Sequence, residues 1–323
     1  MAPSSNDRFS AKKFPASLQS RQGWARLFEM KRPQEPHLHQ IEPTNHCPYA
    51  CIMCPRSRKM KRETGFMDLG LYKKVLDEVA TYAEPVRSRE IELFHFGESL
   101  LHPEIAAMVG YASDRGLNMV LSVNGPQLGP ELAERILAQR PHRIIVSLDG
   151  NDQETYRAAR GNHADFDKAV RNIEALISLH EHTRSAARIS VRLIEMRINT
   201  EQVDAFKKRW EGKNIEVEIR QFFPWGEKEM AGLGSVEKYP AYMPCPFPWQ
   251  YLVVQWNGDV VACCRDYNAV NTMGNVRDAS LKEIWNSSRY EEFRHQMASG
   301  EFRDNPICPD CLALYYTEPG DRA

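Results

Sequence analysis

Short apolar runs with strand character alternate with helix-patterned stretches over most of this chain. The six predicted strands are residues 39–43, 90–96, 119–123, 143–148, 188–195 and 215–222. The helical stretches between them are residues 68–82, 103–115, 129–139, 165–180 and 200–210. Because strands that alternate with helices pair in parallel through crossover connections, this pattern predicts an α/β fold with a parallel sheet.

The two ends of the chain follow different patterns. Residues 1–36 are polar and punctuated by proline, and we expect an N-terminal arm, extended or with one short helix packed on the main domain, that carries no chemistry. Residues 37–223 form the main domain, and the glycine and proline residues of 224–244 predict a linker. Residues 245–323 form a second module, in which Asn257-Gly258 is a strong hairpin signal. This small α+β module has predicted strands at residues 251–256 and 259–262 and a helix at residues 281–294.

Composition narrows the function. The 323 residues suffice for one large domain and a small one. The formal net charge of -1 gives no electrostatic reason to expect binding to nucleic acid or to an anionic membrane. No apolar run approaches the length of a membrane span, and the polar N-terminus lacks the core of a signal peptide, so we expect a cytoplasmic protein. In that compartment eight cysteines indicate metal or redox chemistry rather than disulfides.

The cysteines fall into two groups, which predicts two separate sites. Cys47, Cys51 and Cys54 follow the first predicted strand in one short loop. Three such thiolates cannot complete a tetrahedral zinc site without a distant fourth ligand. They can hold three irons of a four-iron, four-sulfur cluster and leave the fourth iron open to a small molecule. Ordinary loop cysteines or a zinc knuckle are the alternatives.

The spacing of these three cysteines resembles the signature of the radical S-adenosylmethionine (radical SAM) enzymes. The resemblance implies that residues 37–223 form a partial (β/α)6 barrel. It also implies that the open iron chelates the amino and carboxylate groups of S-adenosylmethionine. One electron from the cluster then cleaves this cofactor to methionine and a 5′-deoxyadenosyl radical. The resemblance further implies an electron donor such as flavodoxin or ferredoxin.

Polar residues follow other predicted strands, at the edge where parallel α/β folds form their sites. Gly97-Glu98 resembles the family's Gly-Glu motif, which holds the amino group of the cofactor's methionine, although Ser99 stands where the family usually has proline. The other candidates can bind the ribose hydroxyls, the carboxylate or the adenine of the cofactor, or can be turn residues, surface ion pairs and packing residues. These candidates are Ser122, Asn124, Ser147, Asp149, Arg160, Arg192 and Met53.

The second group holds enough thiols for a second metal site. Cys245, Cys263, Cys308 and Cys311 suffice for a fully ligated cluster or for a zinc ribbon, and spacing alone favours zinc. However, the hairpin before Cys263 and the terminal Cys308-x2-Cys311 resemble the twitch form of the SPASM extension of radical SAM enzymes. That resemblance implies a second four-iron, four-sulfur cluster, close to the substrate.

Cys264 is left over. Adjacent strand residues point to opposite faces, so Cys264 should not bind the cluster that Cys263 holds. It can be a buried packing residue, or a thiol that gives a hydrogen atom to a substrate radical. Aminoglycoside epimerases of the family are understood to use a cysteine in this second way. The resemblance therefore favours an epimerase that acts on a polar, carbohydrate-like small molecule of the aminoglycoside type, as in antibiotic biosynthesis.

Three alternatives stay open: a dehydrogenase that oxidises an aminocyclitol alcohol to a ketone through the auxiliary cluster, a peptide-modifying SPASM maturase, and a non-enzymatic iron–sulfur protein. An electron carrier would need neither an open iron nor polar strand ends. Acids and aromatic residues at the predicted mouth would suit an amine-bearing sugar or would be solvated loop residues. These residues are Glu42, His95, Asp149, Trp225, Asp266 and Tyr267.

Overall fold

The computed structural model describes residues 15–222, 233, 243–303, 305–309 and 311; most of the predicted linker, with Trp225, lies outside them. Within these residues, nine strands form one sheet in the order β6-β5-β4-β3-β2-β1-β7-β8-β9. The strands are β1 (His37–Ile41), β2 (Ile91–Glu92), β3 (Met119–Asn124), β4 (Arg143–Ser147), β5 (Arg188–Glu195), β6 (Glu216–Gln221), β7 (Tyr251–Val254), β8 (Asp259–Val261) and β9 (Thr272–Asn275). β1 to β6 pair in parallel, β7 pairs in parallel with β1, and β8 and β9 continue the sheet antiparallel.

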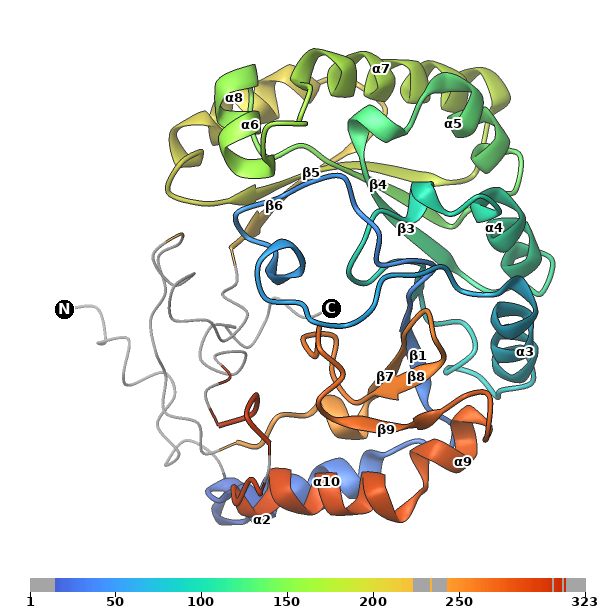
Figure 1. Cartoon of the computed structure of the whole chain (residues 1–323), viewed down its shortest axis with the longest axis vertical. Coiled ribbons are helices and arrows are strands. Elements are labelled where there is room, and N and C mark those ends of the chain that lie inside the picture. The colour runs from blue at the N-terminus through green and yellow to red at the C-terminus, as the bar shows by residue number, and fades with distance from the viewer. Residues whose placement is uncertain (1–14, 223–232, 234–242, 304, 310, 312–323) are drawn as a thin grey trace.

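Helices cover the outside of the parallel part of the sheet, as Figure 1 shows for α3 to α8. The α-helices are α2 (Arg21–Lys31), α3 (Leu69–Ala80), α4 (Ile105–Ser113), α5 (Pro130–Leu137), α6 (Gln153–Arg160), α7 (Phe166–Thr183), α8 (Val203–Trp210), α9 (Leu281–Trp285) and α10 (Ser288–Ser299). Short 3₁₀ helices occupy Ala16–Leu18, Pro55–Ser57, Ser99–Leu101, Gly125–Gln127, Thr200–Gln202 and Phe247–Trp249. The arrangement confirms the predicted α/β fold of a partial (β/α)6 barrel.

Local sequence signals start several of these helices. The side chains of Asp68, Asp152 and Asp165 each accept a hydrogen bond from a backbone N–H of the first turn, of α3, α6 and α7 respectively. The apolar pattern did not predict α6, although Asp152 was a readable N-cap signal. This omission matters because α6 ends at Arg160, a candidate cofactor ligand.

The inner face of the barrel sheet is polar. In the strand register, Asn124 pairs with Ser147, Ser147 with Arg192, and Arg192 with Glu218. Parallel neighbours in register point to the same side, so these side chains form one row across four strands. Along β4, Ile144 and Val146 alternate with the residues that point to this inner face, and both are fully buried in the core on the opposite face. The alternation therefore packs one face of the sheet in the core and lines the other with groups that bind polar molecules.

β2 is much shorter than the predicted strand at residues 90–96. Leu93 still donates its N–H to the carbonyl of Val120 on β3, but the following residues leave the sheet. The Phe96 N–H donates instead to the Glu42 carboxylate, and the Glu98 N–H donates to the carbonyl of His46. These replacement acceptors release the segment from the sheet and direct it toward the loop of the first cysteines.

The C-terminal module extends the barrel sheet. β7 lies along β1, with His37 opposite Tyr251 and Ile41 opposite Val254. α2 packs on this module and not on the barrel, which differs from our expectation for residues 1–36: the ring of Phe28 lies 5.6 Å from that of Trp249, and α2 lies along α10 in Figure 1. None of the helices described is both long enough and apolar enough to span a membrane.

Candidate active site and auxiliary metal site

The loop of the first three cysteines is fixed by backbone hydrogen bonds to the end of α6. The N–H groups of Ala50 and Ile52 donate to the carbonyls of Arg160 and Ala159, at 3.3 and 3.0 Å. These contacts use carbonyls at the C-terminal end of α6, which lack partners inside the helix. The thiols of Cys47, Cys51 and Cys54 all line one cavity of about 520 Å³, which we call the front cavity. The fold thus places the three thiols together beside a cavity that is open to solvent.

Burial favours the protonated form of these three thiols. It raises the pKa of Cys47 to about 11 and that of Cys51 to about 12. Burial also raises the pKa of Cys54. A metal must displace these protons, because the thiolate is the ligand form of cysteine. Metal binding at this loop is therefore expected to release protons.

A network of buried polar groups adjoins the front cavity, which Asn124 and Arg160 line and Glu98 and Asp149 do not. The Glu98 carboxylate accepts hydrogen bonds from the Asn124 N–H and Nδ2, at 2.8 and 2.5 Å. Arg160 donates to the Asn124 side-chain oxygen and, through Nε, to Oδ2 of Asp149 at 2.7 Å. Asp149 also accepts the N–H of Ile194. Four candidates drawn from three strand ends and one helix therefore form a single network.

Of the two carboxyl groups in this network, only Asp149 forms an ion pair with a cation among the described residues. Burial raises the pKa of Glu98 to about 7, although its hydrogen bonds from Leu100 and Asn124 oppose that rise. Burial also disfavours the charge of Arg160, but the Asp149 carboxylate beside it outweighs this effect and raises the pKa of Arg160. Asp149 and Arg160 thus form a buried ion pair, whereas the described hydrogen-bond donors to Glu98 include no cation. A positively charged group bound in the cavity would favour the ionised form of Glu98.

Gly97 allows the chain to pass close to the first loop. A Cβ atom at this position would lie 2.2 Å from the carbonyl oxygen of Thr44 and 2.8 Å from Cα of Asn45. No side chain fits such an approach, which accounts for glycine next to Glu98. Among the other candidates, Met53 and Arg192 also line the front cavity, and Arg192 is paired with Glu218 at 2.9 Å. Ser122 and Ser147 lie half-buried on the sheet and do not line it.

Several groups that line the front cavity were not predicted from the sequence. They share positions at strand ends or in the cysteine loop: Tyr49, Arg56, Glu92, Arg220, Gln221 and Phe222. Arg56 supports the loop by donating to the carbonyls of Cys47 and Tyr49, both at 3.0 Å. Glu92 and Arg220 belong to the alternation of β2 and β6, so the inner-face pattern was the signal that could have identified them.

Glu42 is not the exposed mouth residue that the sequence suggested. Its fully buried carboxylate accepts two hydrogen bonds from Arg62 and backbone N–H bonds from Phe96 and Trp256. His95 faces it, with Nδ1 3.5 Å from Oε1. Asp266 is likewise buried and accepts the backbone N–H groups of Val270 and Asn271. Both carboxylates therefore stabilise loops by accepting backbone N–H groups. His95, in contrast, lines the front cavity.

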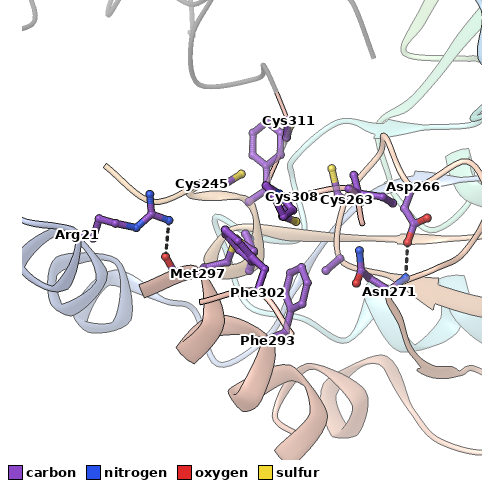
Figure 2. Close-up of a pocket in the computed structure, with 15 residues that line it drawn as sticks. Arg21, Cys245, Cys263, Asp266, Asn271, Phe293, Met297, Phe302, Cys308 and Cys311 are labelled. Atoms are coloured by element: carbon purple, nitrogen blue, oxygen red, sulfur yellow. Dashed lines mark hydrogen bonds between the residues drawn. The ribbon is translucent and has the colours of Figure 1, made fainter. Parts of the chain in front are cut away.

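The four rear cysteines surround a second cavity, of about 100 Å³, which we call the rear cavity (Figure 2). One water needs only about 10–15 Å³ of such space, so the rear cavity has room for a group of several atoms. Burial raises the pKa of Cys245 and of Cys308 to about 12. Among the described residues, no three His, Cys, Asp or Glu side chains converge closely enough to hold a single metal ion. A cluster fits this donor set, because its cysteines bind different irons around a volume.

Cys264 does not line the rear cavity, which Cys263 lines, although the thiols of these two residues contact each other. The Sγ of Cys264 lies 3.6 Å from Oη of Tyr251 and contacts the side chain of His39. Its carbonyl accepts a hydrogen bond of 2.8 Å from Nε2 of His95, a residue of the front cavity. The backbone of Cys264 therefore lies between Cys263, which lines the rear cavity, and His95, which lines the front one, whereas the Cys264 thiol lines neither cavity.

Comparison with known proteins adds independent findings. A model described as the radical SAM superfamily matches residues 41–208, and the SPASM model, an iron–sulfur cluster-binding domain, matches residues 245–312. An AdoMet-dependent heme synthase of Methanosarcina barkeri is 31% identical over 141 residues, which cover 44% of this chain and 39% of that protein. The chain thus spans about two fifths of that relative's length.

Two similar proteins match over most of their length. A S-adenosyl-L-methionine-dependent 2-deoxy-scyllo-inosamine dehydrogenase of Niallia circulans is 22% identical over 274 residues, covering 84% of this chain and 91% of that protein. The structure of BtrN in complex with AdoMet and 2-DOIA has a TM-score of 0.56 at 18% identity, covering 85% of this chain and 92% of that one. At such identity the structural likeness shows the fold alone.

These matches confirm the family resemblance and its cofactors. The radical SAM model implies a four-iron, four-sulfur cluster and S-adenosylmethionine, and the SPASM model implies further iron–sulfur binding. The two cavities and their thiols fit such groups in number, chemistry and position. The chain belongs to the radical SAM superfamily, and its residues 245–312 match the SPASM domain.

Proposed function

We propose that this enzyme epimerises one carbon of a polar, carbohydrate-like small molecule, with Cys264 as the hydrogen-atom donor. Cys47, Cys51 and Cys54 would hold the cluster that binds S-adenosylmethionine in the front cavity. Cys245, Cys263, Cys308 and Cys311 would hold an auxiliary cluster in the rear cavity. The observation that carries the proposal is the position of Cys264, which follows the proposed auxiliary ligand Cys263 and accepts, through its backbone carbonyl, a hydrogen bond from His95 in the wall of the front cavity.

The front cavity suits S-adenosylmethionine through this chain's own residues. Its methionine amino group would lie near Gly97 and Glu98, whose carboxylate has no cation among its described hydrogen-bond donors. Its carboxylate would pair with Arg192, which lines the cavity and, although it bonds Glu218, is 20% exposed, whereas Arg160 is 8% exposed and bonds both Asp149 and Asn124. When bound, the cluster and S-adenosylmethionine supply the radical that removes a hydrogen atom from a substrate C–H bond.

The far side of the same cavity suits a polar substrate. Glu92, His95, Arg192, Arg220 and Gln221 line it and offer both donors and acceptors. Such a lining binds hydroxyl and amino groups through directed hydrogen bonds, as a carbohydrate-like molecule requires. This composition supports a polar small-molecule substrate, such as an aminoglycoside-type sugar.

Cys264 would complete the reaction by transferring a hydrogen atom from its thiol to the substrate radical. Its S–H bond breaks as a C–H bond forms at the substrate radical, and donation from the opposite face inverts the carbon. The thiyl radical left on Cys264 then takes up one electron and one proton. The electron would come from a protein donor such as flavodoxin or ferredoxin, through the adjacent auxiliary cluster.

Turnover of candidate aminoglycosides in deuterated water tests this proposal. Thiol hydrogens exchange with solvent, so the epimer should carry one deuterium at the inverted carbon. Cys264→Ala should still form 5′-deoxyadenosine and lose the epimer. Cys264→Ser is the matched control, because its hydroxyl is similar in size but its O–H bond is too strong to donate a hydrogen atom. Normal epimer from either variant would show that Cys264 only packs in the core.

Dehydrogenation is the second candidate, and the match to 2-deoxy-scyllo-inosamine dehydrogenase over 84% of this chain favours it. In this reaction the substrate radical would lose an electron to the auxiliary cluster and a proton to solvent, which oxidises an alcohol to a ketone. The same experiment separates the two reactions. A ketone without solvent deuterium, formed equally by Cys264→Ser, would identify the dehydrogenase.

A further inference from the structure

Arg21 lies outside both regions that match family models, yet its side chain lines the rear cavity together with the four cysteines. It is the first residue of α2, and Figure 2 shows it beside the cavity that holds Cys245. Trp249, four residues after Cys245, anchors the helix: its Nε1 donates to Glu29 at 2.8 Å, and its ring contacts Phe28. The placement of Arg21 is therefore built into the packing of α2.

The guanidinium of Arg21 is held at the end of α10. Its terminal nitrogen donates to the carbonyl of Met297 at 2.8 Å, the bond drawn in Figure 2. A Cβ atom on Gly300, the residue that ends α10, would lie 3.2 Å from Nε of Arg21, so the side chain packs closely against this glycine. The C-terminal end of a helix favours a cation, and arginine keeps its charge at any working pH.

The apolar surroundings of the Arg21 guanidinium strengthen its electrostatic interactions with groups in the rear cavity. Phe293, Met297 and Phe302 line the same cavity, and charges interact more strongly across apolar surroundings than across water. Reduction adds one negative charge to an iron–sulfur cluster with four thiolate ligands, so a nearby cation stabilises the reduced form more than the oxidised one. Net charge around a cluster is one of the factors that set its reduction potential.

We propose that Arg21, supplied by the N-terminal helix, raises the reduction potential of the auxiliary cluster. The proposal rests on the proposed assignment of Cys245, Cys263, Cys308 and Cys311 as its ligands. Arg21 acts as a positioned charge and not as a ligand. Two other charges are nearby: Arg265, which favours the charged forms of Cys245 and Cys263, and the buried carboxylate of Asp266. Both stay unchanged in the test, so the shift measured reports Arg21.

The test is a redox titration of the full-length, anaerobically reconstituted enzyme, followed by electron paramagnetic resonance. The auxiliary signal is assigned by its persistence in Cys51→Ala, which removes the front cluster. Arg21→Gln keeps an N–H that can reach the Met297 carbonyl but removes the charge. Arg21→Lys keeps the charge. Arg26→Gln is the matched control, because Arg26 lies on the same helix but lines the separate groove between α2 and α10.

We expect a lower midpoint potential of the auxiliary cluster in Arg21→Gln, with the parental value in Arg21→Lys and Arg26→Gln. A parental potential in Arg21→Gln, with reduced thermal stability, would show that Arg21 only caps α10 and would overturn the proposal. If Arg21→Gln does not retain the cluster, Arg21→Lys decides: a parental potential supports the role of the charge, and a lowered one contradicts it. A wild-type protein without the auxiliary cluster would instead refute the ligand assignment.

Discussion

Arg62 holds the buried carboxylate of Glu42 with two parallel hydrogen bonds, Nη1 to Oε2 at 3.0 Å and Nη2 to Oε1 at 2.9 Å. The pair joins segments that are far apart in sequence. Glu42 follows β1, Arg62 follows the cysteine loop, and Nε of Arg62 donates to the carbonyl of Tyr267 in the C-terminal module. This ion pair therefore fixes the loop of the front cavity to the module of the rear one.

Replacing Glu42 by glutamine should destabilise the protein strongly. The change leaves the guanidinium of Arg62, whose side chain is 8% exposed, without its counter-charge. Breaking a buried pair from one side costs about 3–5 kcal/mol in the free energy of unfolding. Urea unfolding of the cluster-free protein measures this loss. Glu63→Gln, at an exposed position nearby, should have almost no effect, and an equal loss in both variants would contradict the role of the pair.

The same carboxyl group predicts a pH dependence of stability. Burial opposes the ionisation of Glu42, but His95 and Arg62 outweigh it and lower its pKa to about 2. A carboxyl whose pKa is lower in the folded state stabilises the protein fully above its unfolded pKa, which is about 4.3. This contribution, on the order of 3 kcal/mol, is lost as the pH falls from that value toward 2. The difference in unfolding free energy between wild type and Glu42→Gln, measured from pH 6 downward, should shrink over this window.

Arg192 and Arg160 should respond differently to mutation. Arg192→Gln removes the arginine that we assign to the cofactor carboxylate, and hydrogen bonds between charged groups contribute about 1.5–3 kcal/mol. We expect S-adenosylmethionine to bind roughly 10- to 100-fold more weakly, measured by equilibrium dialysis of the reconstituted enzyme. Arg160→Gln should instead unfold the protein more easily, because it leaves Asp149 buried without its cation. Unchanged cofactor affinity in Arg192→Gln, with Arg197→Gln as the exposed control, would remove Arg192 from the cofactor site.

Metal content tests the two cysteine groups. Two four-iron, four-sulfur clusters require about eight irons per chain. Cys51→Ala and Cys308→Ala should each reduce this to about four, since each removes a ligand of one cluster only. Only Cys51→Ala should abolish the formation of 5′-deoxyadenosine through loss of the front cluster itself. Stoichiometric zinc in the anaerobically prepared wild type would refute the auxiliary cluster.

Local patterns in the sequence determined much of this fold. The period of apolar residues identified the barrel strands and most of the helices, because strand and helix periodicity depend on near neighbours. The spacing of Cys47, Cys51 and Cys54 resembled a cluster loop, although the spacing alone also fitted ordinary loop cysteines or a zinc knuckle. The role of Gly97 could also be predicted from the sequence, because it belongs to a motif of adjacent residues. The polar residues after β3 and β4 were correctly expected at one edge of the sheet.

Other features depend on contacts that no local pattern encodes. β2 ends at Glu92 because the acceptor for the Phe96 N–H is the carboxylate of Glu42, 54 residues earlier. Glu42 was expected at the mouth of the site, but its carboxylate is buried and accepts hydrogen bonds from Phe96 and Trp256, which are far away in the sequence. α2 was expected on the barrel, whereas Trp249 and α10, more than 200 residues away, hold it on the C-terminal module.

The position of the two cysteine groups relative to each other depends most clearly on the tertiary structure. The sequence separated them and predicted one site for each. Pairing of β1 with β7 made the barrel and the module one sheet, since an edge strand binds whichever partner the rest of the chain delivers to it. That pairing, with the hydrogen bond from His95 to the carbonyl of Cys264, placed the backbone of Cys264 between Cys263 and His95. The sequence therefore determined how the cysteines are grouped along the chain. The long-range packing of strands decided which residues and which cavity each cysteine contacts.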